Sequence, residues 1–186
     1  MYIAKYISKN ISMERPSANE YGTFYAYYIS LVPEGDIIEL MRAEHQKTQA
    51  ILQQIPPQKG NFKYEEGKWT IKELLQHMID SERIMNYRAL RFARKDKTEL
   101  PGFEQDDYVS VLEETERFPL STFVEDWEIL RENTVRLFSR FNDEESKRTG
   151  RANNNTFSVR ALAYINVGHE IHHRNILLER YLKSSD

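Results

Sequence analysis

The stretch SVRALAYINVGHEIHHRNILLERYL, residues 158–182, has the repeat of an amphipathic helix. At 100° per residue, its apolar side is centred on Val159, Leu162, Asn166 and Leu177. A helix of about 25 residues is roughly 37 Å long at 1.5 Å per residue. Such a length is unusual for an isolated surface helix and typical of a helix bundle.

Three further segments show the same repeat: residues 36–55, residues 70 to about 94, and residues 122–141. Thr70 and Glu73 have the spacing of a capping box at the start of the second segment. Thr122 and Glu125 have the same spacing at the start of the third. With only 7 glycines and 6 prolines, the chain has too few turn residues for a many-stranded sandwich or barrel.

Residues 96–121 form an unusually long connection between the second and third helices. A connection of this length suits a crossover that returns along a bundle. The sequence therefore predicts an all-α fold, an antiparallel four-helix bundle with one long crossover loop. At 186 residues the chain is most simply one domain.

The composition excludes several classes of protein. Hydrophobic residues make up 40% of the chain, and no apolar stretch approaches the ~20 residues of a membrane-spanning helix. A net charge of -3 gives no overall attraction for nucleic acid or anionic lipid. The absence of cysteine excludes disulfides, thiolate metal sites and a cysteine nucleophile. We expect a cytoplasmic protein that acts on a small molecule and binds neither nucleic acid nor membrane.

Three of the 5 histidines lie in the motif HEIHH, residues 169–173. His169 and His173 fall on the apolar side of the last helix, one turn apart, with His172 at its edge. A buried imidazole needs a partner. For a single histidine, a bond to a carbonyl or carboxylate is the simpler explanation. For the stacked pair, a metal site is equally well supported, because histidines at i and i+4 offer two nitrogens to one ion.

A third ligand must come from earlier in the chain. HEIHH matches the zinc-protease pattern H-E-x-x-H, but too few residues follow His173 to supply that family's downstream ligand. Glu170 and His173 give one Glu-x-x-His motif, whereas a di-iron bundle needs two. His77, in the middle of the other long helix, is the best candidate, and His45 is expected at the surface or its boundary. Three histidines with an open fourth position make a catalytic site rather than a structural one.

Several short motifs accompany these histidines: GKWTIKE (67–73), DSER (80–83), YRAL (87–90), PGF (101–103), RAL (160–162), GHEIHH (168–173) and ERY (179–181). Together they resemble the DinB-like (YfiT/DinB) superfamily over nearly the whole chain. The most specific part is one histidine on the second helix with a His-x-x-x-His pair on the last. The resemblance therefore implies His77, His169 and His173 as metal ligands.

The resemblance also implies a bundle, commonly a homodimer, that holds one divalent metal ion of the Zn, Ni or Fe class. Characterised members are metal-dependent transferases and isomerases that use an external low-molecular-weight thiol such as bacillithiol, mycothiol or glutathione. The missing cysteines agree with a thiol that comes from outside the chain. The segment beginning Met13-Glu-Arg-Pro resembles the usual start of the family. We therefore expect residues 1–14 to be an N-terminal extension and residues 15–186 to be the single domain.

These features favour a divalent-metal-dependent enzyme, a thiol-dependent S-transferase or a related hydrolase or isomerase. Glu170 and Glu82 are candidate catalytic bases, although a solvent-exposed helix face is the simpler position for both. Asn166, one turn before His169, is a candidate for binding a cofactor or substrate, and it is equally well explained as a satisfied core amide.

Two other functions fit part of the sequence. A non-catalytic metal-binding stress-response bundle predicts a closed coordination shell, with His172 or a carboxylate as a fourth protein ligand. A nucleic-acid-binding protein is supported only by the short basic run at residues 88–97, which is more simply an exposed helix end.

Overall fold

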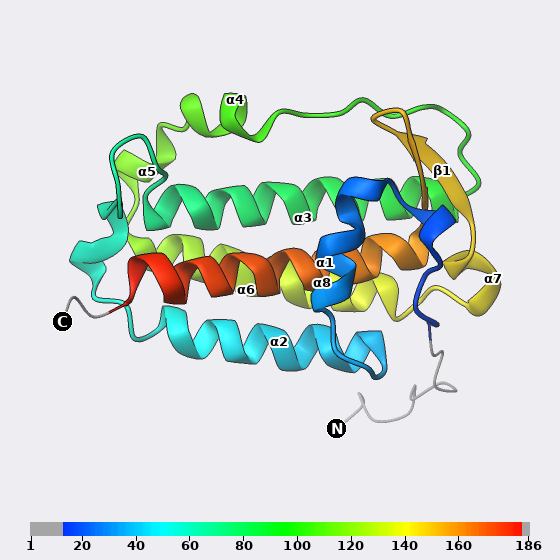
Figure 1. The fold of residues 1–186 in the computed structure, drawn as a ribbon, viewed down its shortest axis with the longest axis horizontal. Helices are drawn as coiled ribbons and strands as arrows, with labels where there is room; N and C mark the ends of the chain where they lie inside the picture. Colours follow the sequence, from blue (N-terminus) through cyan, green and yellow to red (C-terminus); the bar gives the residue numbers. More distant parts are fainter. Residues whose placement is uncertain (1–12, 184–186) are drawn as a thin grey trace, which may run out of the picture.

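The computed structural model describes residues 13–183. Apart from Met13 and Glu14, the predicted N-terminal extension lies outside the described residues. Four long helices form the body of the molecule (Figure 1): α2 (Ile37–Leu52), α3 (Ile71–Ala93), α6 (Leu120–Phe138) and α8 (Val159–Ile176). They confirm the predicted four-helix bundle.

The order of the helices in space differs from their order in the chain. α2 and α3 each pack against both α6 and α8, so α2 lies diagonally opposite α3. Figure 1 shows that α3 and α6 run in one direction while α2 and α8 run in the other. The reason is the predicted crossover, which returns the chain along the length of the bundle before α6 begins.

The helix starts follow from local capping. The backbone N–H of Glu73 donates to Thr70 Oγ1 over 3.1 Å, and the Glu73 carboxylate accepts from the N–H of Thr70 over 2.6 Å, as a capping box predicts. The predicted start of the third helix at Thr122 is wrong, because α6 begins at Leu120. Its N-cap is Pro119, and a proline at a helix start loses no hydrogen bond.

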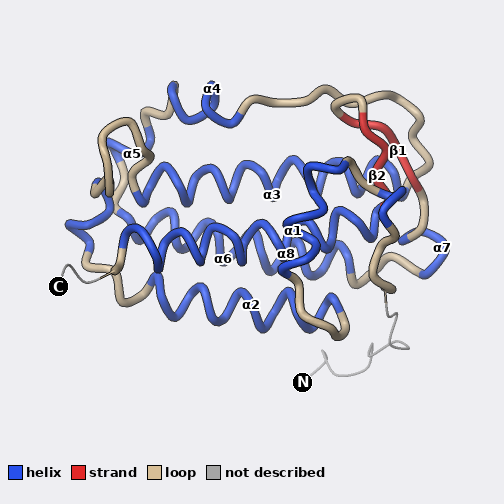
Figure 2. Tube along the Cα trace, viewed as in Figure 1, coloured by secondary structure: helices blue, strands red, loops and turns tan. Residues whose placement is uncertain are grey.

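A β-hairpin and several short helices complete the fold (Figure 2). Asn153 and Asn154 have φ values of 47° and 59°, which asparagine tolerates and which close a tight turn between two strands. This hairpin was not predicted from the sequence. The remaining elements are α1 (Ala26–Leu31), α4 (Gln105–Ser110), α5 (Glu114–Arg117), α7 (Asp143–Ser146), β1 (Thr149–Ala152), β2 (Asn155–Ser158), a π turn (Leu177–Tyr181) and 3-10 turns at Ala18–Glu20, Thr23–Tyr25 and Pro57–Asn61.

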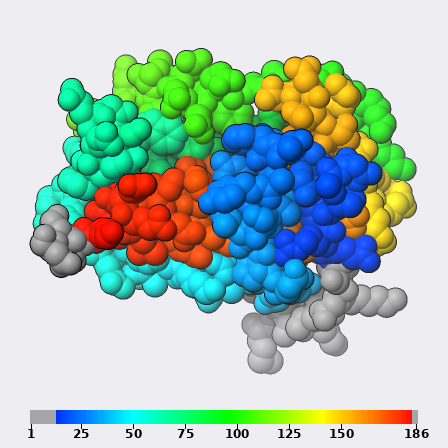
Figure 3. All heavy atoms as spheres, in the orientation of Figure 1, coloured from blue at the N-terminus to red at the C-terminus, as the bar shows by residue number. Residues whose placement is uncertain are grey.

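Helix α1 lies across α8 on the outside of the bundle. Figure 3 shows α1, in blue, covering the middle of α8. The approach depends on Gly168, since a Cβ at this position would lie 2.0 Å from the carbonyl oxygen of Tyr28. The aromatic residues of α1 are therefore held close to the histidine-bearing part of α8.

A polar layer divides the core of the bundle into two apolar clusters. One cluster includes Met41, Phe92 and Phe138, and the other includes Leu75 and Trp127. Each long helix contributes buried polar residues at its middle. They are Glu44, Thr48, His77, Ser81, Glu82, Asn86, Arg131, Thr134, Asn166, Glu170 and His173.

Arg131 of α6 lies at the centre of this layer. Its guanidinium donates to both oxygens of Glu82 on α3, over 2.6 Å from Nη2 and 2.9 Å from Nε, and it also binds the carboxylate of Glu170 on α8. Thr48 of α2 donates to Glu170 over 2.6 Å. Burial by itself lowers the pKa of Arg131, but the carboxylates of Glu170 and Glu82 raise it above its ordinary value. One network therefore connects all four long helices.

Removal of the central charge should be costly. Arg131→Met leaves two buried carboxylates without a cation, so we expect a loss of about 3–5 kcal/mol in the free energy of unfolding, measured by urea denaturation. Adding Glu82→Gln and Glu170→Gln to this variant should recover part of the loss, because no uncompensated charge remains.

Arg136 provides a matched control on the same helix. It forms an exposed ion pair with Glu132, so Arg136→Met should cost less than about 1 kcal/mol. An equal cost for Arg131→Met and Arg136→Met would contradict a central role for the buried network.

Candidate metal centre

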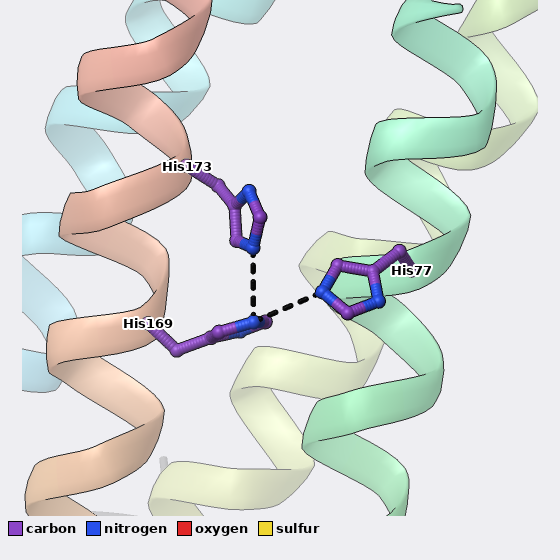
Figure 4. A group of neighbouring side chains, drawn as sticks. All are labelled: His77, His169 and His173. Carbon is purple, nitrogen blue, oxygen red and sulfur yellow. Dashed lines mark hydrogen bonds between the residues drawn. The ribbon is translucent and has the colours of Figure 1, made fainter. Parts of the chain in front are cut away.

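The structure brings together three histidines from two helices. His77 extends from α3, and His169 and His173 extend from α8, with their rings turned toward one another (Figure 4). The Nε2 atom of His169 lies 3.1 Å from Nε2 of His77 and 3.0 Å from Nε2 of His173. These are the three residues that the sequence predicted as metal ligands.

The environment of these rings favours their neutral form. Burial lowers the pKa of His77 to about 4, and it holds the pKa values of His169 and His173 well below 6.5, with a further contribution from the neighbouring imidazoles. A metal ion binds imidazole only when the nitrogen is unprotonated. At neutral pH the three nitrogens are therefore available as ligands.

The donor set and its spacing fit a divalent ion. A tetrahedral zinc site with Zn–N bonds of about 2.0–2.1 Å places its nitrogens about 3.3 Å apart. The two Nε2 separations given above are close to this value. Within the described part of the chain, no carboxylate and no fourth histidine joins this group. The described residues thus place three imidazole nitrogens, and no fourth ligand group, where they could hold one ion.

A cavity of about 400 Å³ opens beside His77 and His169. We call it the aromatic cavity, because rings from two elements line it. They are Phe24, Tyr25 and Tyr28 from the segment around α1, and Phe103 from the crossover. The ring of Tyr28 packs edge-on against His169, with centroids 5.4 Å apart. A ligand in this cavity would therefore lie next to the imidazoles.

The two other histidines lie outside the group. His45 is half-buried with its ring 4.5 Å from the ring of Trp127, which fits the boundary position expected for it. His172 is partly exposed and contacts the rings of Tyr27 and Tyr28. Neither contributes a nitrogen to the cluster of His77, His169 and His173.

Three further residues were selected from the sequence. Glu82 and Glu170 are 4% and 1% exposed and bind Arg131, so the expectation of a solvent-exposed face is wrong for both. A catalytic role for either one stays a prediction. Asn166 lines the aromatic cavity and donates to Oδ1 of Asn86 over 3.1 Å, so its amide is both paired and next to the cavity.

Two features of the site were not predicted from the sequence: the buried charge of Arg131, and which ring of the aromatic segment at residues 21–28 faces the histidines. Arg131 comes one turn after Trp127 on the apolar side of its helix, and a charge on such a side signals a buried ion pair. Tyr28 belongs to an aromatic segment with no regular repeat, so no local pattern indicates which ring faces the histidines.

Comparison with known proteins gives the family. Residues 40–177 match the DinB superfamily. The chain belongs to the DinB superfamily. No curated protein matches it. Among the described residues, none of the helices is both long and apolar enough to cross a membrane.

Two solved structures from Bacillus subtilis share the DinB fold of this chain. One is YfiT, described as a probable metal-dependent hydrolase with an unusual four-helix bundle topology, at 16% identity and a TM-score of 0.67. The match covers 79% of this chain and 85% of YfiT. The other is the DinB-like protein YjoA, at 18% identity and a TM-score of 0.58, with 82% of this chain and 94% of YjoA covered. At these identities the likeness establishes the fold.

His45 should make the protein sensitive to acid. Burial, together with the guanidinium of Arg131, lowers its pKa from 6.5 to about 4. As the pH falls through 6.5, the unfolded chain gains a proton that the folded chain does not bind, so the free energy of unfolding falls between pH 6.5 and about 4. In His45→Phe, the slope of the free energy of unfolding against pH should be smaller in this window. The decrease should correspond to up to about one fewer proton taken up on unfolding.

The measurement is urea denaturation at several pH values, with a chelator present so that metal release makes no contribution. If the free energy of unfolding changed equally with pH in the wild type and in His45→Phe across this window, the attribution of the acid sensitivity to His45 would be contradicted.

Proposed function

We propose that this protein is a divalent-metal-dependent enzyme that acts on a small molecule, with His77, His169 and His173 as the metal ligands. The observation that carries the proposal is the convergence of three Nε2 atoms beside a cavity of about 400 Å³. Cavities of this size hold small organic ligands. The description of YfiT as a probable metal-dependent hydrolase supports the same class of chemistry.

The open coordination sphere favours an enzyme over a non-catalytic metal-binding bundle. A closed structural site needs four protein ligands. Among the described residues neither His172 nor a carboxylate joins the group, and His169 lines the aromatic cavity. A water molecule or a substrate atom could therefore complete the shell from the cavity side.

A bound divalent ion supplies Lewis acidity, which lowers the pKa of a water molecule or thiol so that an anionic nucleophile forms near neutral pH. The residues of the chain position the reactants. Tyr28 and Asn166 line the cavity next to His169, where a ring and an amide can orient a substrate. Glu82 and Glu170 hold Arg131 and so fix α3 and α8 relative to each other, which makes them positioning residues in this proposal.

Within this class we propose a thiol-dependent S-transferase. In such a transfer, the thiol sulfur forms a bond to a substrate carbon, and the leaving group departs with the electron pair of the broken bond. The thiol proton passes to solvent or to the leaving group. The absence of cysteine from the chain supports an external thiol. A hydrolase, in which water replaces the thiol, is the alternative within the same site.

The metal content of purified protein tests the proposal. We expect about one divalent ion per chain in the wild type and a loss of at least about tenfold in metal affinity in His77→Ala, His169→Ala and His173→Ala, since each removes one of only three protein ligands. Elemental analysis after reconstitution and gel filtration gives the number of ions that each chain retains, and the three weakened variants should retain fewer than the wild type.

His172→Ala is the matched control, because His172 is adjacent to His173 on the same helix and lies outside the cluster. It should retain the metal. Wild-type protein that stays metal-free after reconstitution, or full retention of metal in His77→Ala, would overturn the proposal. Conjugation of a thiol to 1-chloro-2,4-dinitrobenzene, compared with hydrolysis of 4-nitrophenyl acetate, then separates the transferase from the hydrolase.

A further inference from the structure

The side-chain amide of Asn166 belongs to a buried chain of hydrogen bonds. Its Nδ2 atom lies 3.1 Å from Oδ1 of Asn86 on α3, and Nδ2 of Asn86 lies 2.6 Å from Oγ1 of Thr134 on α6. The Thr134 hydroxyl in turn lies 2.5 Å from Oε1 of Glu82. All four residues are buried. The chain of hydrogen bonds therefore runs from the lining of the aromatic cavity to the polar layer around Arg131.

The direction of these hydrogen bonds is fixed at the Glu82 end. Arg131 donates to both oxygens of Glu82, so this group is a carboxylate, which accepts hydrogen bonds and donates none. The other neighbour of the Thr134 hydroxyl is the carbonyl oxygen of Leu130, 3.0 Å away, which also only accepts. The hydroxyl must therefore donate its single proton to one of these oxygens, and Oγ1 of Thr134 accepts from Asn86.

Each of the two amides then has one orientation that satisfies its neighbours. A side-chain amide has a nitrogen that donates and an oxygen that accepts. Asn86 turns its nitrogen toward Thr134, which leaves its oxygen toward Asn166. Asn166 in turn directs its nitrogen at Asn86, and its own oxygen, Oδ1, is left over. The acceptors beside Thr134 thus determine which atom of Asn166 remains for a ligand.

The remaining Oδ1 atom of Asn166 is available to the aromatic cavity. Asn166 lines this cavity together with His169, which is one turn further along α8. Among the described residues no group donates to this oxygen, and the fold does not seal it from the surface. An acceptor on a cavity wall loses its water when a ligand binds. The loss costs free energy unless the ligand itself donates a hydrogen bond.

We propose that Asn166 selects ligands that carry an O–H or N–H donor, and that Asn86 and Thr134 are positioning residues that keep its oxygen toward the cavity. This inference rests on the proposed function and names a substrate class for the same site: small molecules with a hydroxyl, amine or amide N–H group beside the histidines. A site that hydrogen-bonds its substrate rejects an analogue without the matching group, because the buried polar atom is then left unpaired. Substrates that offer only an ether, ester or carboxylate oxygen at this point are therefore disfavoured.

The experiment compares two probes, 3-mercaptophenol and 3-methoxybenzenethiol, which differ by one methyl group that removes the phenol donor. Both have a thiol that can bind a metal ion. The rise from Asn166 to His169 is roughly 4.5 Å along the axis of α8, a distance that a benzene ring spans. Isothermal titration calorimetry on metal-loaded protein gives the two dissociation constants. We expect the wild type to bind 3-mercaptophenol at least about fivefold more tightly, as one additional hydrogen bond predicts.

Substitutions along the chain of hydrogen bonds test its role. Asn166→Ala should abolish the preference, because it removes the acceptor. Thr134→Val should reduce it to about twofold or less, since Asn86 can then turn over and Asn166 can present its nitrogen instead. Thr134→Ser keeps the hydroxyl and should keep the preference. If Thr134→Val does not fold, Asn166→Ala and Thr134→Ser still test the inference.

Thr48→Val is the matched control. Thr48 is also a buried threonine that donates to a carboxylate of the polar layer, that of Glu170, but it lies outside the chain of hydrogen bonds that ends at Asn166. Thr48→Val should therefore keep the preference for 3-mercaptophenol. An equal loss of preference in Thr48→Val and Thr134→Val would reject the positioning role of Thr134.

Equal affinities of the wild type for the two probes would overturn the inference, as would a preference that survives Asn166→Ala or a failure of both probes to bind. Loss of metal from Asn166→Ala would overturn it too, because the oxygen would then serve the ion and not a ligand.

The same titrations on metal-free protein separate this inference from the proposed function. If the protein never takes up metal but still shows a preference that depends on Asn166, the inference is supported and the metal enzyme is rejected. If the protein binds metal and shows no preference, only the inference is rejected.

Discussion

The guanidinium of Arg131 is buried between the carboxylates of Glu82 and Glu170, and the geometry of the bundle depends on this contact. The three residues come from α6, α3 and α8, so their ion pairs set the positions of these three helices relative to one another along the bundle axis. Charges removed from water are tolerated only with close partners and well-aligned hydrogen bonds. A small sliding of one helix would break these bonds, whereas an apolar core could accommodate such a shift.

The same layer contains the three histidines. Glu170 follows His169 directly in the sequence, and Glu82 is a little more than one turn beyond His77 on α3. The contacts that align Glu82 and Glu170 with Arg131 therefore also fix the turns of α3 and α8 from which the imidazoles extend. The apolar clusters on either side exclude water from the ends of the bundle. Access to the histidines comes from the aromatic cavity beside them.

Elements outside the four long helices determine the surroundings of the site. α1 packs on α8 at Gly168 and brings Tyr28 to His169. The crossover supplies Phe103, Gln105 and Asp106 to the lining of the aromatic cavity. DinB bundles with the same helices but different connections could therefore present different cavities, because the connections supply much of the lining.

Much of the fold could be predicted because the long helices have strong local signals. The repeat of residues 158–182 and the capping box at Thr70 are properties of short stretches of chain, and the structure confirms both. The hairpin at Asn153 and Asn154 was missed because two short strands have little repeat of their own. Glu44 and Thr48 interrupt the apolar side of α2 at its middle. The structure explains this interruption, because Thr48 donates to Glu170 and Arg174 donates to Glu44.

By itself, the sequence determined the helices, the absence of a cysteine ligand or nucleophile and the three histidines that face inward, since each follows from residue type and helical period. Only the tertiary structure decided that His77 meets His169 and His173, that Arg131 compensates two carboxylates, and that the aromatic cavity borders the cluster. These features join residues far apart in the chain. Their proximity depends on how the helices pack and where the crossover runs, and no local pattern encodes either.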